Sequence, residues 1–285
     1  MRSHVTIPAR RRARARLAAV VALGALLAAP GGIAAQPADT TGHSREPLFT
    51  AADAWVAGGF ALGTVAMLPL DRRIAEGLQD PNTQANEFLK EASTGFEVIS
   101  QPGAYIIGGS LYAIGRIGGN ERMADLGLHG TEAVFVSEVA TYLLKGLMGR
   151  ARPYVSADTV PTSFRLGRGF GHHDYRSFPS GHTSTAFAAA AAVTSETSRW
   201  WPRSTKFIAP LMYGGATMVG LSRMYNNRHW ASDVVLGAAV GTFAGLKVVR
   251  YHHSHPGNRL DDILLGVSAV PDGAGGWMLV GSRRF

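Results

Sequence analysis

Cations and histidines stand at the ends of apolar segments in this 285-residue chain, in a pattern that suits the binding of a phosphate-like anion. Lys145 and Arg152 are seven residues apart, close to two helical turns, so both side chains can point the same way. An ammonium beside a forked guanidinium is a good pair of ligands for such an anion. Pro153 disfavours the helical conformation at Arg152, so the helix is expected to end there.

A second motif, PSGH at residues 179–182, opens another apolar segment. Ser180 is a favoured N-cap residue, and Gly181 allows a ligand to approach the backbone closely. The free N–H groups and positive dipole of the helix start then form an anion site, with His182 in the first turn. Taken alone, the motif is explained equally well by a capped helix that carries a surface histidine.

A third motif joins Ser222 and Arg223, at the end of one segment, to His229 and Asp233 at the start of the next. His229 and Asp233 are four residues apart, so on a helix the carboxylate can reach one ring nitrogen. That bond fixes the tautomer and leaves the other nitrogen free as a nucleophile. For a single His–Asp pair, a structural hydrogen bond is the commoner explanation.

Six apolar segments, each about the length of a long helix, position these motifs. They lie near residues 51–70, 102–118, 131–149, 180–197, 207–224 and 231–249. The pattern predicts an all-α, up-and-down bundle of about six helices. Such a bundle brings the end of the third segment, the start of the fourth, the end of the fifth and the start of the sixth together. The three ambiguous motifs then meet in one anion-binding pocket with two histidines.

The C-terminal residues have a different pattern. Ile263–Val270 and Trp277–Arg284 flank a PDGAGG turn, which predicts a short β-hairpin appended to the helical body. Two histidine clusters, at residues 172–174 and 252–255, could bind metal by composition. We assign no metal to either: the first is expected to shape the pocket mouth, and the second to form a solvated cap after the last helix.

The N-terminus predicts export. Six arginines within residues 1–35 accompany the apolar run Leu17–Ala29, and Ala34 and Ala35 follow, which is the order of a secretory signal peptide. An uncleaved anchor helix is the alternative. The arginines supply six of the eight net positive charges, so the basic balance does not indicate nucleic-acid binding. The predicted organisation is a signal peptide (1–35), a linker (36–50), a helical domain (51–255) and a hairpin tail (256–285).

The motifs K-x6-RP (145–153), PSGH (179–182) and SR-x5-H-x3-D (222–233) resemble, in order and spacing, the signature of the type-2 phosphatidic acid phosphatase and vanadium haloperoxidase superfamily. Every signature position is matched, and the resemblance covers about residues 50–250. It implies an acid phosphatase/haloperoxidase-like helical core. It also implies hydrolysis of phosphomonoesters or pyrophosphates through a phosphohistidine, with no metal and no cofactor.

The resemblance also implies roles. His229 is expected to be the nucleophile, Asp233 to orient it, and His182 to protonate the leaving oxygen. The oxygens of the transition state are expected to be bound by five groups: Lys145, Arg152, Ser180, Gly181 and Arg223. Three other functions use the same pocket. They are halide oxidation on bound vanadate, transfer of the phosphoryl group to an alcohol acceptor, and binding without catalysis.

The substrate is expected to be a phosphorylated lipid or a small phosphate ester, in the periplasm or cell envelope. A soluble or membrane-associated form is favoured over an integral one because Glu132 and Glu138 interrupt the third segment. In addition, a cleaved leader followed by six spans would place the catalytic end in the cytoplasm.

The loop from Tyr154 to Ser177 is expected to cover the pocket. Its three arginines either recruit acidic headgroups or are solvated: Arg165, Arg168 and Arg176.

Overall fold

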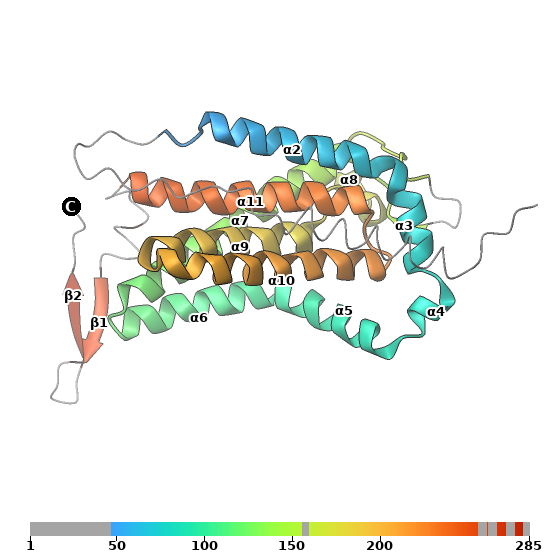
Figure 1. Cartoon of the computed structure of the whole chain (residues 1–285). Helices are drawn as coiled ribbons and strands as arrows, with labels where there is room; N and C mark the ends of the chain where they lie inside the picture. Colours follow the sequence, from blue (N-terminus) through green and yellow to red (C-terminus); the bar gives the residue numbers. More distant parts are fainter. Residues whose placement is uncertain (1–46, 156–159, 256–260, 262–266, 272–276, 282–285) are drawn as a thin grey trace, which may run out of the picture.

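The structure, a computed structural model, describes residues 47–155, 160–255, 261, 267–271 and 277–281. The predicted signal peptide and most of the linker lie outside these residues. The described chain is mostly helical (Figure 1). Its long helices are α2 (Ala51–Met67), α5 (Glu87–Ser100), α6 (Gly103–Ile117), α7 (Glu121–Met148), α9 (Gly181–Trp200), α10 (Thr205–Tyr225) and α11 (Ala231–Ser254). Its short helices are α3 (Asp71–Leu78), α4 (Pro81–Gln84) and α8 (Arg168–Gly171).

The prediction of an all-α body is confirmed, and the six predicted segments correspond to α2, α6, α7, α9, α10 and α11. Two features differ from the prediction. Helix α7 begins ten residues early, at Glu121, because the Asn120 side chain caps it by accepting a hydrogen bond from the Met123 N–H. Helix α5 is an additional helix, whose four charged residues leave it without a long apolar run.

Helices α9 and α11 form the centre of the bundle, with α7, α10 and α2 packed around them (Figure 1). Glycines on α11 allow the close approach: a Cβ on Gly241 would lie 2.1 Å from the carbonyl oxygen of Ser184. The N–H of Ser180 donates to the carbonyl oxygen of Asp233 at 2.9 Å. The start of α9 is thereby fixed against the start of α11, and these two starts carry the second and third motifs.

Two acidic residues of α7, Glu132 and Glu138, have partners inside the bundle. Glu138 accepts hydrogen bonds from the Tyr105 hydroxyl at 2.9 Å and from the Thr185 hydroxyl at 3.2 Å. Glu132 lies 2.5 Å from Nε2 of His252 on α11. The charges that interrupt the apolar pattern of the third segment are therefore paired within the bundle, and the side chain of Glu132 is 20% exposed.

The outer surface of the bundle exposes many large apolar side chains. They belong mainly to α2, α5, α6, α7 and α10, and the side chains of Trp55, Phe88 and Leu211 are 83%, 76% and 74% exposed. Two stretches of the described residues, Ala51–Leu78 and Ala231–Ser254, are long and apolar enough to cross a membrane. The first is mostly exposed, whereas the second is mostly buried inside the bundle.

A short antiparallel pairing lies near the C-terminus, beside the helical body (Figure 1). Strand β1 (Val267–Pro271) pairs with β2 (Trp277–Gly281), with Val267 opposite Gly281. Of the tail predicted at 256–285, the structure describes only these strands and Asp261. All predicted site residues belong to the helical body.

Candidate active site

The structure brings the three motifs together at one end of the bundle. His229, between α10 and α11, lies 2.8 Å from the carbonyl oxygen of Ser177, just before the PSGH motif. Lys145, near the end of α7, places its ammonium nitrogen 3.2 Å from the position that a Cβ on Gly181 would occupy. Glycine at 181 therefore leaves room for the lysine.

The tautomer of His229 follows from its partner. A carbonyl oxygen can only accept a hydrogen bond, so Nδ1 of His229 must carry the proton that it donates to Ser177. Nε2 of the neutral ring then carries a lone pair. Burial lowers the pKa of His229 well below its usual value, which keeps the ring neutral. The nitrogen opposite the Ser177 contact is thus available as a nucleophile.

Asp233 lies farther from His229 than the sequence predicts. The distance from Nδ1 of His229 to Oδ2 of Asp233 is 3.5 Å, an ion-pair distance, and His229 precedes α11 instead of lying on it. The closer partners of the Asp233 carboxylate are the Ser177 hydroxyl at 2.5 Å and the Trp230 N–H at 2.8 Å. Orientation of the ring is therefore shared between a backbone carbonyl and this carboxylate.

Arg150, which the motif analysis does not single out, holds Asp233 in place. Its guanidinium is fully buried, pairs with the Asp233 carboxylate and lies 2.7 Å from a carboxylate oxygen of Asp71. It also donates to the Ser232 hydroxyl at 2.7 Å. This cation keeps the pKa of Asp233 low, at about 2, against the opposing effect of burial. Asp233 therefore stays ionised beside His229.

Three cations of the predicted site gather close together with few anions to balance them. Arg152 and Arg223 are almost completely buried. Burial and the nearby Arg152 lower the pKa of Lys145 to about 7. Arg223 pairs with Glu97 of α5, an acidic residue that sequence reasoning missed because it lies outside the motifs. An excess of buried positive charge favours the entry of an anion.

His182 occupies the first turn of α9, as predicted. Burial and the neighbouring Arg223 lower its pKa to about 3. Ser180 is the N-cap residue, but its hydroxyl makes no capping bond and instead accepts from the Thr183 hydroxyl at 2.8 Å. The first N–H groups of α9 consequently have no side-chain cap, which suits a bound anion.

The loop arginines have partners inside the protein. Arg165 and Arg168 place their guanidinium groups 5.5 Å and 4.2 Å from the ring centre of Tyr175. Arg176 donates to the carbonyl oxygen of Gly169 at 2.6 Å. Arg165 is exposed, as the solvated alternative expects, while Arg168 and Arg176 are half-buried. All three also make contacts that stabilise the loop itself.

The two histidine clusters differ from each other. His173 lies at the predicted pocket, where Arg152 lowers its pKa. The second cluster is not a solvated cap after the last helix, because His252 and His253 lie within α11 and His252 is only 5% exposed. Its contacts are with α7 and α9, at the end of α11 away from His229.

Comparison with known proteins identifies relatives of this region. Residues 128–256 match the family model described as the PAP2 superfamily. The lipid A 1-phosphatase of Porphyromonas gingivalis is 48% identical over 69 residues, which are 24% of this chain and 15% of that protein. The probable diacylglycerol pyrophosphate phosphatase 1 of Schizosaccharomyces pombe is 28% identical over 158 residues, with 46% of this chain and 55% of that protein covered.

Among solved structures, the crystal structure of Aquifex aeolicus LpxE aligns with 64% of this chain and 96% of its own, at 21% identity and a TM-score of 0.46. The chain spans 15% and 55% of the length of the two curated relatives. Residues 128–256 contain all eight predicted site residues, from Lys145 to Asp233. This region of the chain is therefore similar to the PAP2 superfamily.

Proposed function

We propose that the chain is a phosphatase that hydrolyses a phosphomonoester or a pyrophosphate, with a phosphorylated lipid as its substrate class. The observation that carries the proposal is the orientation of His229. Its Nδ1 proton is held by the Ser177 carbonyl, so its Nε2 lone pair is free beside a cluster of three cations. The lipid phosphatases named among the relatives support the same class of reaction.

The proposed reaction has two steps. Nε2 of His229 attacks phosphorus, and the bond from phosphorus to the leaving oxygen breaks as His182 donates a proton to that oxygen. In the second step His182 accepts a proton from water, whose oxygen attacks the phosphohistidine and releases phosphate. Asp233 stabilises the positive charge that the His229 ring gains on phosphorylation.

The phosphate oxygens in this proposal are held by fixed positive groups. Lys145, Arg152 and Arg223 supply the charge, while Ser180 and the backbone N–H of Gly181 supply oriented donors. Such groups are worth more in a buried site than in water, because there is less solvent to screen them. Glu97 pairs with Arg223, so a bound phosphate would share this guanidinium with a carboxylate.

The setting of the enzyme in this proposal is a membrane surface of the cell envelope. Many large apolar side chains of α2, α5, α6, α7 and α10 are exposed, and acyl chains would cover them. The mainly exposed stretch Ala51–Leu78 supports the same arrangement. Export by the predicted signal peptide at 1–35 is part of the proposal.

The experiment that tests the proposed function is phosphate release by the full chain, purified in detergent and assayed in EDTA. The substrates are p-nitrophenyl phosphate, phosphatidate and an isoprenyl pyrophosphate. Turnover of the lipid substrates well above that of p-nitrophenyl phosphate would support a lipid phosphatase. Absence of turnover on all three would contradict it, and bromide oxidation with vanadate and peroxide, or transfer to an added alcohol, would then identify the alternatives.

Replacing His182 with alanine is expected to reduce the hydrolysis of alkyl phosphates by about 10²–10⁴-fold. The expected loss on p-nitrophenyl phosphate is far smaller, because that leaving group needs little protonation. The low pKa of His182 leaves it unprotonated at neutral pH in the free site, so the negative charge of the substrate must raise this pKa by offsetting Arg223. Measured kcat values for the two substrates check the prediction, and equal losses would contradict the role of general acid.

A further inference from the structure

A second cluster of ionisable side chains lies at the other end of the central helices. It contains three histidines and three carboxylates: His129 and Glu132 on α7, Glu196 on α9, His252 and His253 on α11, and Asp261. His129 is 1% exposed and Glu196 is completely buried. His129 and Lys145 are sixteen residues apart on α7, so the cluster is about 24 Å from the phosphate site. The proposed phosphatase reaction uses none of these residues.

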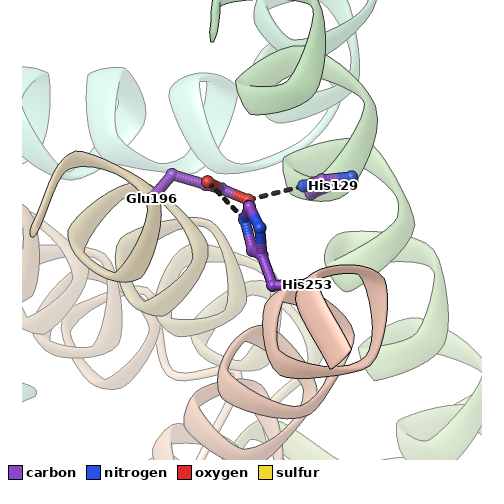
Figure 2. A group of neighbouring side chains, drawn as sticks. All are labelled: His129, Glu196 and His253. Carbon is purple, nitrogen blue, oxygen red and sulfur yellow. Dashed lines mark hydrogen bonds and ion pairs between the residues drawn. The ribbon is translucent and has the colours of Figure 1, made fainter. Parts of the chain in front are cut away.

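Three members of the cluster converge from three different helices (Figure 2). Nδ1 of His129 lies 2.5 Å from Oε1 of Glu196. Nε2 of His253 lies 3.1 Å and 3.0 Å from the two oxygens of the same carboxylate. Two imidazoles and one carboxylate are thus directed at a single point between α7, α9 and α11. The side chain of His253 is 26% exposed, so this ligand of the group is in contact with solvent.

A carboxylate and a second imidazole lie next to the ring of His129. Nε2 of His129 lies 3.9 Å from Oδ1 of Asp261, which is an ion-pair distance. This nitrogen makes no hydrogen bond within the described residues. The neighbouring ring of His252 stacks on His129 with 4.1 Å between ring centres. A carboxylate on the far side of a histidine ring favours positive charge on that ring and so raises its basicity as a ligand.

We propose that His129, Glu196 and His253 form a Zn²⁺ site. Two histidines and a glutamate are an established ligand set for zinc, with a fourth position left to water. Ligands at the usual zinc distances lie about 3.3 Å apart in a tetrahedral site. The carboxylate of Glu196 therefore has to withdraw from His129 by less than about 1 Å to admit the ion.

The alternative for the same residues is a metal-free network in which the imidazoles carry protons. The carboxylates raise the pKa of His252 to about 9 and also raise that of His129, so this network is electrostatically possible. The two states differ in protons, because zinc binds neutral imidazole and must displace those protons. Bound zinc would join α7, α9 and α11 at the end opposite the phosphate site, and its role would be to stabilise the fold.

The experiment measures zinc directly, with the full chain in detergent and without a polyhistidine tag. After treatment with EDTA and dialysis against Zn²⁺, we expect one zinc per chain by elemental analysis. Zinc at about 100 times its Kd is expected to raise Tm by about 5–10 °C. His253→Gln and Glu196→Gln should each weaken zinc binding at least about tenfold.

The matched control is His255→Gln, which changes the same residue type two positions away. His255 stacks on Tyr251 with 4.6 Å between ring centres and lies outside the proposed ligand set. This variant should bind zinc as the unchanged chain does. The proposal is overturned if the unchanged chain binds no zinc, if zinc leaves its Tm unchanged, or if His253→Gln and Glu196→Gln bind zinc as tightly as His255→Gln. Since these readouts exclude activity, they are independent of the proposed phosphatase function.

Discussion

Replacement of His229 with alanine is expected to lower kcat for phosphate release by at least about 10³-fold, the largest effect of any single change at the site. The reason is that alanine removes the nitrogen that forms the bond to phosphorus, and the site offers no second nucleophile in that position. Lys145, Arg152 and Arg223 remain in place, so vanadate or phosphate should still bind to the variant. The measurements are kcat with a lipid phosphate and the Kd for vanadate.

The matched control for this prediction is His173→Ala, which removes an imidazole near Arg152 without removing the proposed nucleophile. Its activity should stay within a few-fold of that of the unchanged chain. Rapid acid-free quenching with labelled substrate should trap phosphate on the unchanged chain and on His173→Ala, but not on His229→Ala. Full turnover by His229→Ala would eliminate the phosphohistidine mechanism.

The motif residues could be placed from sequence because their positions are tied to helix ends. Ser180 ends up at the N-cap of α9, and Lys145 lies in the last turn of α7, as the spacing predicts. The contact between His229 and Ser177 could not be predicted in this way. It depends on how closely α11 approaches α9, which is set by Gly241 and its neighbours meeting the backbone of the facing helix.

The pairing of Arg150 with Asp233 could not be predicted from the sequence either, because it also depends on how the helices pack. Arg150 stands two residues before Arg152 in the first motif, and nothing in the spacing says which of the two faces the ligand and which faces the carboxylate. Its second partner, Asp71, is 79 residues away in α3. Such a pairing requires the packing of α3 against the start of α11, which a pattern of apolar residues does not specify.

The charged residues of α7 show that hydropathy alone does not indicate whether a helix faces water or lipid. Glu132 and Glu138 interrupt an apolar segment, and on the sequence this favours a soluble or membrane-associated form over an integral one. In the structure both carboxylates have partners inside the bundle, while Phe135, Val139 and Leu143 of the same helix are exposed. Interior polar pairs of this kind are compatible with a lipid-facing outer surface.

Arg150→Met is expected to have the largest effect on stability, with a loss of about 3–5 kcal/mol in the free energy of unfolding. Methionine approximates the length of the aliphatic part of arginine but leaves Asp71 and Asp233 together, buried and without their shared cation. The loss of Arg150 also raises the pKa of Asp233, so stability should fall less at low pH, where both carboxylates are protonated. Thermal unfolding in detergent, followed by circular dichroism, should show a decrease in Tm of about 10 °C.

Two further variants separate the loss of charge balance from the loss of packing. Arg152→Met removes a buried guanidinium that pairs with no carboxylate in the described part of the chain. This variant should weaken phosphate binding, and its change in Tm should be far smaller than that of Arg150→Met. Arg150→Met combined with Asp71→Asn removes one of the two stranded carboxylates and should recover part of the lost stability. If Arg150→Met unfolds at the same temperature as the unchanged chain, the buried pairs contribute no net stability. In that case, any fall in its kcat would report only the loss of orientation at Asp233 and His229.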